Sequence, residues 1–244
     1  MINWLRDDHQ NPAICVGDTS LPINIRRHAR AKRLTMRLAP DGSEVRVTLP
    51  TWGRTADALS FAKARTQWLA TQLAKVPQRV AIVDGQQISY RGNSLRIEWD
   101  ASLGRKPVLQ AAVLRIGGPA EGLEGRVRRW LEAEALRLCS QDLAYYCDRA
   151  DLPCPSLRLS RAQRRWGSCS GDRRTGRCIR INWRLVMAPD HVRRSVVAHE
   201  VAHLVHFDHS PAFHALLEDL FEGPLTAADG WLKRDGRTLY AAFG

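Results

Sequence analysis

The sequence lacks the features that mark membrane, secreted and repeat proteins. No apolar run approaches the length of a bilayer span, and residues 1–8 show no signal-peptide pattern. Internal repeats and low-complexity segments are also absent. A chain of 244 residues can bury a sizeable core in one or two domains. We therefore expect a soluble cytoplasmic protein that does not bind membranes.

Cysteine is present, but no two cysteines form the C-x-x-C pair of a structural zinc site. Reduced thiols in a reducing compartment are the expected state. Cys169 precedes the histidine-rich segment described below. A catalytic cysteine would need one of those histidines as its base, but their pattern is better explained by metal binding. The six cysteines are Cys15, Cys139, Cys147, Cys154, Cys169 and Cys178.

Lysine is scarce and arginine abundant, which gives the chain a formal net charge of +12. Such a surface can be an ordinary solvated one, or it can attract nucleic acid or acidic proteins. No nucleic-acid-binding motif accompanies the basic residues, so nucleic acid stays an open partner besides a peptide or protein substrate. Local clusters lie at residues 26–30, 126–129, 164–165 and 173–174.

Histidine is concentrated in one segment, since six of the eight histidines lie between His191 and His214. Within it, residues 199–203 read His-Glu-Val-Ala-His. Residues four apart share one face of a helix, so His199 and His203 can offer their imidazoles to one metal ion. Glu200 lies one position round the helix, where it can reach a water on that metal without ligating the ion. This is the H-E-x-x-H arrangement of zinc peptidases.

The flanking residues favour a helix through this motif. Pro189 and Asp190 are typical of a helix start. The alternative is that these histidines are ordinary core or surface residues, which an adjacent glutamate and further histidines make less favoured. Apolar residues recur at helical spacing at Val192, Val196, Val197, Val201, Leu204 and Val205.

A catalytic zinc site needs a third protein ligand, and three histidines compete for that position. His209 ranks first if the helix ends near residues 207–208, because Ser210-Pro211 marks the start of another helix. His206 ranks second, since in a continuous helix it would lie about 10 Å along the axis from His199. His214 would lie inside the second helix and ranks third.

Several segments share the order and spacing of one known family. They are residues 165–170 (RWGSCS), 181–185 (INWRL), 188–189 (AP), 199–203 (HEVAH) and 209–213 (HSPAF), with 33–38 and 45–50 nearer the start. In these segments the chain resembles the YgjP-like metal-dependent peptidases, which are relatives of the SprT-like and WLM proteases. The resemblance spans about residues 22–243. It implies a zincin-like catalytic half in which His209 is the third metal ligand. His206 stands where related zinc peptidases carry glycine, so we expect another turn conformation there.

Periodicity predicts an α+β fold. Residues 21–50 and 79–117 have the texture of strands, and residues 54–76 that of one helix between them. Gly117-Gly118-Pro119 suggests a domain boundary, with a β-rich region over residues 1–118 and a zincin-like helical domain with a small sheet over residues 119–244. In the second domain we expect helices over 123–149, through the metal motif, and from Ser210 and Thr226, with strands at 156–160 and 178–183.

The hypothesis is a metallopeptidase in which Zn²⁺ is held by His199, His203 and His209, and Glu200 is the general base. Mn, Co or Ni could occupy the same donors. The alternatives are a protease associated with nucleic acid and a metal-binding scaffold without activity. We expect the substrate to add as a strand beside residues 178–183 or the loop 166–170. Ser168, Asn182 and Trp183 either line that cleft or belong to the core, and the residue that stabilises the oxyanion is open among Arg165, Tyr240 and His214.

Overall fold

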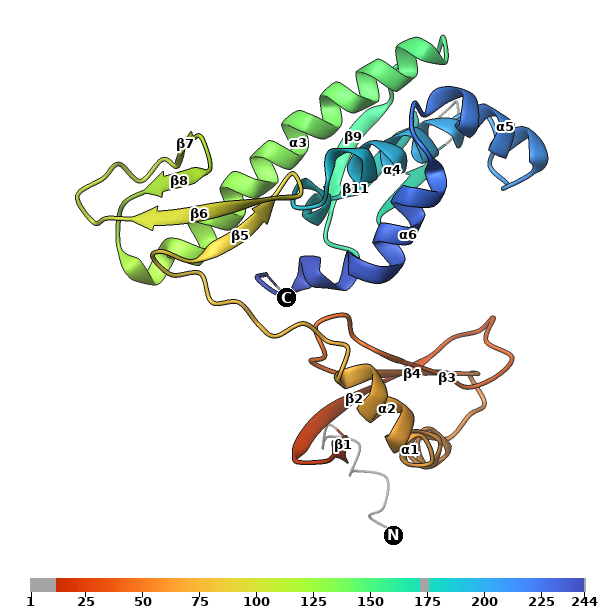
Figure 1. The fold of residues 1–244 in the computed structure, drawn as a ribbon. Helices are drawn as coiled ribbons and strands as arrows, with labels where there is room; N and C mark the ends of the chain where they lie inside the picture. Colours follow the sequence, from red (N-terminus) through yellow and green to blue (C-terminus); the bar gives the residue numbers. More distant parts are fainter. Residues whose placement is uncertain (1–11, 172–175, 244) are drawn as a thin grey trace. The chain divides into compact units, whose positions relative to one another are not determined.

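The computed structural model describes residues 12–171 and 176–243 (Figure 1). The basic cluster at residues 173–174 lies outside the described residues. The chain divides into two compact units, residues 1–78 and residues 79–243. Among the described residues there are six α-helices and three small sheets, which confirms the predicted α+β class. No helix of the described part combines the length and apolar character needed to cross a bilayer.

The first unit is a four-stranded sheet with two short helices. The strands are β1 (Ala13–Val16), β2 (Thr19–Arg27), β3 (Thr35–Leu38) and β4 (Val45–Leu49), in the order β1-β2-β4-β3 with β2 parallel to β4. Val45, Val47 and Leu49 are fully buried, because alternate residues of a strand point to one face.

The single helix predicted over residues 54–76 is two helices, α1 (Thr55–Lys63) and α2 (Thr66–Leu73). The break lies at Ala64 and Arg65, and Arg65 leaves the helical conformation with a φ of −121°. The Thr66 hydroxyl donates to the Lys63 carbonyl at 2.7 Å, which satisfies a carbonyl that the helix end leaves free. A side-chain hydrogen bond therefore stabilises the break between the two helices, and helical periodicity alone does not predict it.

The second unit begins with another four-stranded sheet. Its strands are β5 (Gln87–Tyr90), β6 (Asn93–Trp99), β7 (Val108–Gln110) and β8 (Val113–Ile116), in the order β5-β6-β8-β7. After the 3₁₀ turn η2 (Ala120–Gly122), the long helix α3 (Leu123–Arg149) runs beside this sheet (Figure 1).

The sheet and α3 share one hydrophobic core, which explains why the units divide earlier than residue 118. Ile97 and Leu114 from the sheet are fully buried in the same cluster as Val127 and Leu131 from α3. The glycine-rich turn at residues 117–118 is thus a tight connection between two elements packed together, and the division lies instead at residues 78–79.

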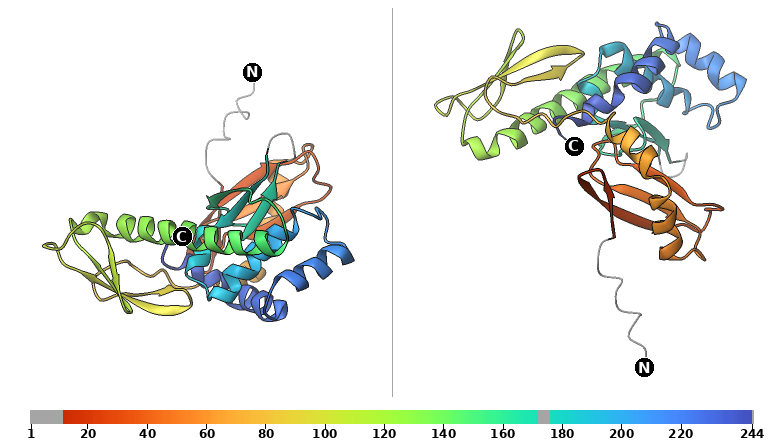
Figure 2. Two further views of the ribbon diagram at one scale, coloured as in Figure 1. Left: turned by 90° about the horizontal axis from the view of Figure 1, so that it is seen from above. Right: turned by 60° about the horizontal axis from the view of Figure 1, so that its bottom comes forward.

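The remainder of the second unit is a small sheet surrounded by helices. The strands β9 (Ser156–Ser160), β10 (Gly167–Ser170) and β11 (Cys178–Asn182) have the order β10-β11-β9. β11 is parallel to β9 and antiparallel to β10. The 3₁₀ turn η3 (Trp183–Val186) leads into α4 (Asp190–Ala202), and α5 (Pro211–Leu220), α6 (Leu225–Asp235) and η4 (Gly236–Tyr240) follow. β9 and α4 both pack on α3, as the views of Figure 2 show.

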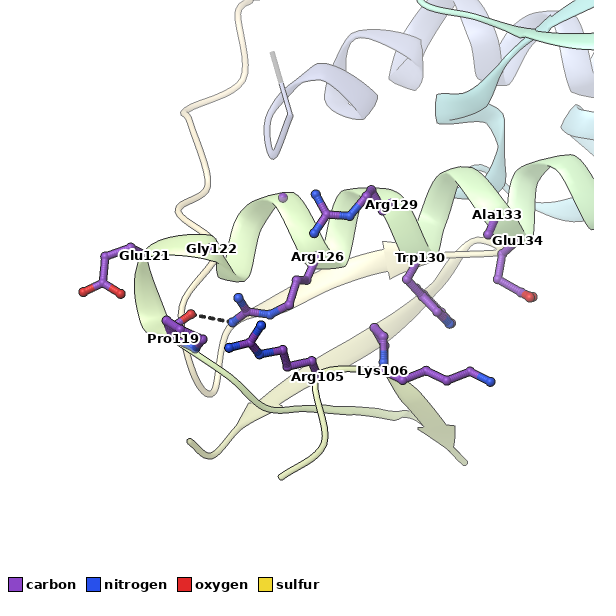
Figure 3. Close-up of a pocket in the computed structure, with 12 residues that line it drawn as sticks. Arg105, Lys106, Pro119, Glu121, Gly122, Arg126, Arg129, Trp130, Ala133 and Glu134 are labelled. Carbon is purple, nitrogen blue, oxygen red and sulfur yellow. Dashed lines mark hydrogen bonds between the residues drawn. The ribbon is translucent and has the colours of Figure 1, made fainter. Parts of the chain in front are cut away.

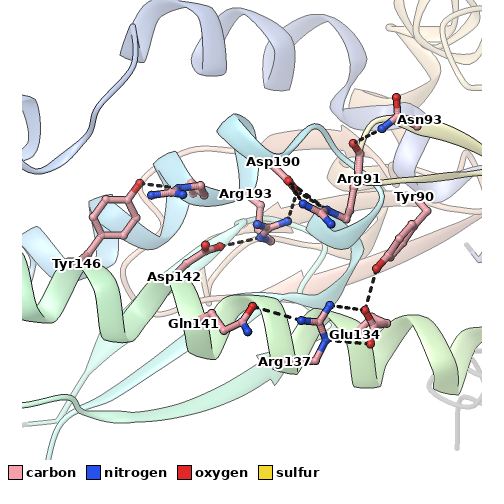
Figure 4. A network of polar contacts seen from close by, with 11 residues as sticks. Tyr90, Arg91, Asn93, Glu134, Arg137, Gln141, Asp142, Tyr146, Asp190 and Arg193 are labelled. Atoms are coloured by element: carbon pink, nitrogen blue, oxygen red, sulfur yellow. Dashed lines mark hydrogen bonds and ion pairs between the residues drawn. The ribbon is translucent and has the colours of Figure 1, made fainter. Parts of the chain in front are cut away.

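Ion pairs hold α4 against its neighbours (Figure 4). Arg193 of α4, which is 2% exposed, donates to Asp142 of α3 at 2.7 Å and also pairs with Asp190 at the start of its own helix. Asp190 in turn pairs with Arg91 of the β5–β6 turn. Because α3 and the β5–β6 turn both pair with residues in the first turn of α4, the position and direction of this helix are fixed.

Candidate functional site

Three histidines meet at the end of α4. His199 lies in the last turn of the helix, His203 is its C-cap residue, and His209 returns to them from the following turn. One ring nitrogen from each lies within 4.8 Å of the other two. The Nε2 atoms of His199 and His209 are 3.2 Å apart. Phe213 of α5 is fully buried, and its ring lies 4.6–4.9 Å from all three imidazole rings. The phenylalanine of the HSPAF segment therefore forms the floor of the cluster.

The turn that brings His209 back starts earlier than residues 207–208. α4 ends at Ala202, and the chain tightens through bonds from Leu204 N–H to the Val201 carbonyl at 2.8 Å and from Val205 N–H to the Ala202 carbonyl at 3.1 Å. His206 is not among the described residues with a positive φ. The turn therefore needs no glycine, because a negative φ is open to any residue.

His206 serves the site through its backbone. Its carbonyl lies 2.9 Å from His203 Nδ1, and since a carbonyl only accepts, Nδ1 must carry the proton. The lone pair of His203 is then on Nε2, the nitrogen left free for a metal, and the ring is locked in orientation. Asp208, another residue type suited to such an orienting role, is exposed. His214 lies 6.4 Å from His209, ring centre to ring centre, and is not part of the three-histidine cluster.

His199 has the charge state that metal binding needs. Burial, together with repulsion from His203 and His209, lowers the pKa of His199 to about 4. The ring is therefore neutral near pH 7, and a neutral imidazole is the form that donates a lone pair to a metal. Three imidazole nitrogen donors that converge without a carboxylate among them suit zinc or another late divalent transition metal.

The Glu200 side chain lies against β10, next to Gly167. The residue is 5% exposed, and one carboxylate oxygen, Oε2, makes no hydrogen bond to the described residues. Burial raises the pKa of the carboxyl to about 7, although the backbone N–H of Cys169 and the charge of Arg165 pull it downward. A buried carboxylate with one uncommitted oxygen, on the residue that follows His199 in the chain, has a lone pair that can accept a proton.

Gly167 explains why β10 can pass so close to this carboxylate. A Cβ atom at Gly167 would lie 2.4 Å from Glu200 Oε1 and 2.8 Å from Cδ, both well inside van der Waals contact. The glycine of the RWGSCS segment is therefore a close-approach residue. The RWGSCS segment is one of those that carry the family resemblance, but the sequence alone predicts no role for Gly167.

The strand β10 lies at one edge of the small sheet. The segment 166–170 was expected as a loop, but its residues 167–170 form this strand, which pairs with β11 among the described residues. The other predicted substrate edge, residues 178–183, is wrong, because β11 is the central strand and its backbone is used on both sides. Asn182 and Trp183 are 0% and 1% exposed, so they belong to the core and do not line a cleft. Ser168 is half-buried on the edge strand.

The hydrogen bonds between β10 and β11 show which backbone groups of β10 face away from the sheet. Asn182 N–H donates to the Trp166 carbonyl at 2.7 Å, and residues of an antiparallel strand alternate between bonding inward and outward. Gly167 and Cys169 are then the residues whose backbone groups face the open edge, and the Cys169 N–H indeed reaches Glu200. Of the oxyanion candidates, Tyr240 is 5% exposed, with its ring centre 5.9 Å from that of Trp166, and Arg165 is the one whose charge acts on Glu200.

Comparison with known proteins adds one result to this geometry. A family model described as "YgjP-like, metallopeptidase domain" matches residues 32–235. The match covers most of both compact units and includes the three histidines, Glu200 and β10. No curated protein and no solved structure matches the chain.

Proposed function

The chain belongs to the YgjP-like metallopeptidase family, and on that premise we propose that it hydrolyses peptide bonds with Zn²⁺ held by His199, His203 and His209 and with Glu200 as the general base. The observation that carries the proposal is the set of three imidazole nitrogens within 4.8 Å of one another, next to a buried glutamate with an uncommitted oxygen. A scaffold that only binds metal has no need of that glutamate.

Nitrogen donors and the family together favour zinc, while Mn, Co or Ni remain chemically compatible with the same ligands. When bound, the ion supplies Lewis-acid chemistry, since it acidifies a water molecule and polarises the carbonyl of the scissile bond. The chain contributes the orientation of the ligands. The His206 carbonyl holds the His203 ring, and Phe213 supports all three imidazoles from below.

Glu200 moves the proton in this proposal. Its free Oε2 accepts a proton from the attacking water and later delivers that proton to the leaving amine. The Cys169 N–H holds the carboxylate, and Gly167 lets the edge strand come close enough for this contact. Both residues thus position the base without touching the metal ligands.

The substrate adds as a strand along β10. The outward N–H and carbonyl of Gly167 and the outward carbonyl of Cys169 offer the backbone hydrogen bonds of strand addition, which depend little on the substrate's side chains, while the Cys169 N–H stays with Glu200. A peptide held there would run directly over the Glu200 carboxylate. We infer from this arrangement that extended, unfolded segments are the preferred substrates.

The test combines metal analysis with proteolysis of an unfolded protein. Glu200→Gln should keep stoichiometric metal and lose turnover, and His209→Ala should lose the metal. His206→Ala is the matched control, because it removes a neighbouring imidazole but keeps the carbonyl that orients His203. Full activity in Glu200→Gln would refute the general base. Metal retained by His209→Ala and lost by His206→Ala would refute the ligand set, and a wild-type protein that binds zinc but cleaves nothing would leave the scaffold alternative.

A further inference from the structure

A basic groove lies in the second unit, at the opposite end of α3 from β9. It has a volume of about 820 Å³. One wall comes from the loop between β6 and β7, with Arg105 and Lys106, and the other from the first turns of α3, with Arg126, Arg129 and Trp130. Figure 3 shows the side chains of both walls around this space, whereas Glu121 points away from the arginines. The groove shares no residue with the histidine cluster.

Two glycines of the helical wall make room for its arginines. A Cβ atom at Gly122 would lie 2.6 Å from a guanidinium nitrogen of Arg126, and one at Gly125 would lie 3.4 Å from that of Arg129. Each glycine is four residues before its arginine, so each guanidinium lies back across the helix where a side chain would otherwise stand. Arg126 is held further by a hydrogen bond to the Pro119 carbonyl at 2.6 Å. The helix surface is thus shaped around two oriented guanidinium groups.

A glycine also makes room for the arginine of the loop wall. A Cβ atom at Gly118 would lie 2.9 Å from Cγ of Arg105 and 3.5 Å from its Nε. The Arg105 stem therefore packs directly on the backbone of the turn that leads to α3. Lys106 follows it in the chain and lines the same groove.

These cations are not neutralised by the protein. Within residues 12–171 and 176–243, no ion pair involves Arg105, Lys106, Arg126 or Arg129. Glu134 also lines the groove, but its carboxylate already has partners in the protein. It accepts from the guanidinium of Arg137 at 2.7 Å and from the Tyr90 hydroxyl at 2.8 Å.

An aromatic ring completes the groove. Trp130 is half-buried, and its centroid lies 5.1 Å from that of Tyr90 at an interplanar angle of 44°. Tyr90 is fixed by Glu134, so the indole is backed by a rigid neighbour. A supported indole among uncompensated guanidiniums matches two needs of an unpaired nucleotide, which are a stacking surface for the base and forked donors for the phosphate.

We propose that the basic groove binds single-stranded nucleic acid. Arg105, Lys106, Arg126 and Arg129 hold the phosphates, and Trp130 stacks with a base. An acidic polypeptide would satisfy the cations but offers no planar ring for the indole, and a duplex keeps its bases stacked out of reach of a concave site.

The test measures binding of a fluorescent single-stranded DNA of about 12 nucleotides to the full-length protein across a range of salt concentrations. In the Arg105→Glu/Arg129→Glu double variant, affinity should fall at least about tenfold, and the dependence of log K on log salt should become shallower by about 1.4, or roughly 0.7 for each phosphate that the variant no longer neutralises. Trp130→Leu should weaken binding about tenfold without changing that slope. The control Arg158→Glu/Arg96→Glu makes the same charge change at two exposed arginines outside the groove and should bind nearly as the wild type does.

Four outcomes would overturn the proposal. The control pair could weaken binding as much as the groove pair, which would assign the effect to net charge. A polyglutamate of equal charge could compete as well as the oligonucleotide, which would assign the groove to acidic polypeptides. The wild-type protein could fail to bind the strand at about 0.1 M salt. Competition by a free mononucleotide at equal phosphate concentration would restrict the site to small nucleotides, which also contradicts a strand-binding groove.

Discussion

Gly167→Ala provides the sharpest test of how the edge strand and the general base depend on each other. The added methyl carbon would stand 2.4 Å from Glu200 Oε1, 2.7 Å from Cγ and 2.8 Å from Cδ. Ordinary contacts between such atoms are about 3.5 Å or longer. The carboxylate or the strand must therefore move by about 1 Å.

The carboxylate is the part that we expect to move, because the backbone of β10 is held by its ladder with β11. Its room for movement is small, since Glu200 is only 5% exposed. A displacement of about 1 Å in a catalytic group can cost about 100-fold in rate. The loss of stability should stay near that of modest overpacking, about 1–3 kcal/mol. The three histidines are not in the clash, so metal content should be unchanged.

The assay is turnover of an unfolded protein substrate, measured with metal content and thermal unfolding on the same preparations. Gly104→Ala is the matched control, because a Cβ atom there meets nothing within 4 Å. We expect the control to have wild-type activity and Gly167→Ala to lose about 100-fold while it keeps its metal. Activity within a few-fold of wild type in Gly167→Ala would show that the position of Glu200 does not limit the reaction, and would contradict its assignment as general base.

Three further predictions concern other parts of the fold. Arg193→Met should lower the free energy of unfolding in urea by about 3–5 kcal/mol, because it leaves the buried carboxylate of Asp142 without its partner; a loss below about 1 kcal/mol would contradict the importance of this pair. Burial opposes ionisation of Asp190, but the guanidiniums of Arg91 and Arg193 outweigh it and lower its pKa below the ordinary 3.8. Its contribution to stability is therefore present above that value and lost as the pH falls through the lowered pKa, so Asp190→Asn should flatten the acid limb of a plot of melting temperature against pH. Burial raises the thiol pKa of the cysteines at 139 and 147 to about 12, so at about pH 8 both should resist a disulfide reagent until the protein unfolds, whereas the exposed cysteines react at once.

Much of the local structure could be read from the sequence. The helix expected over residues 123–149 is α3 with those bounds, and Ser210 caps α5 as its position before Pro211 suggested. These elements depend on helical periodicity and on capping side chains, which act between residues a few positions apart. The spacing within HEVAH likewise places two imidazoles on one helix face, because that relation needs only the helical repeat.

Contacts between distant segments decided the rest. Nothing in the local pattern distinguishes β10 as the edge strand from β11 as the centre, because strand order depends on which segments of the whole chain pair. The approach of Gly167 to Glu200 and the packing of Phe213 under the imidazoles likewise join elements far apart in sequence. Residue types and their spacing thus determined which groups could bind a metal and move a proton. Only the tertiary structure decided which backbone carbonyl orients His203 and which strand lies open beside the base, since both depend on the path of the chain between the motifs.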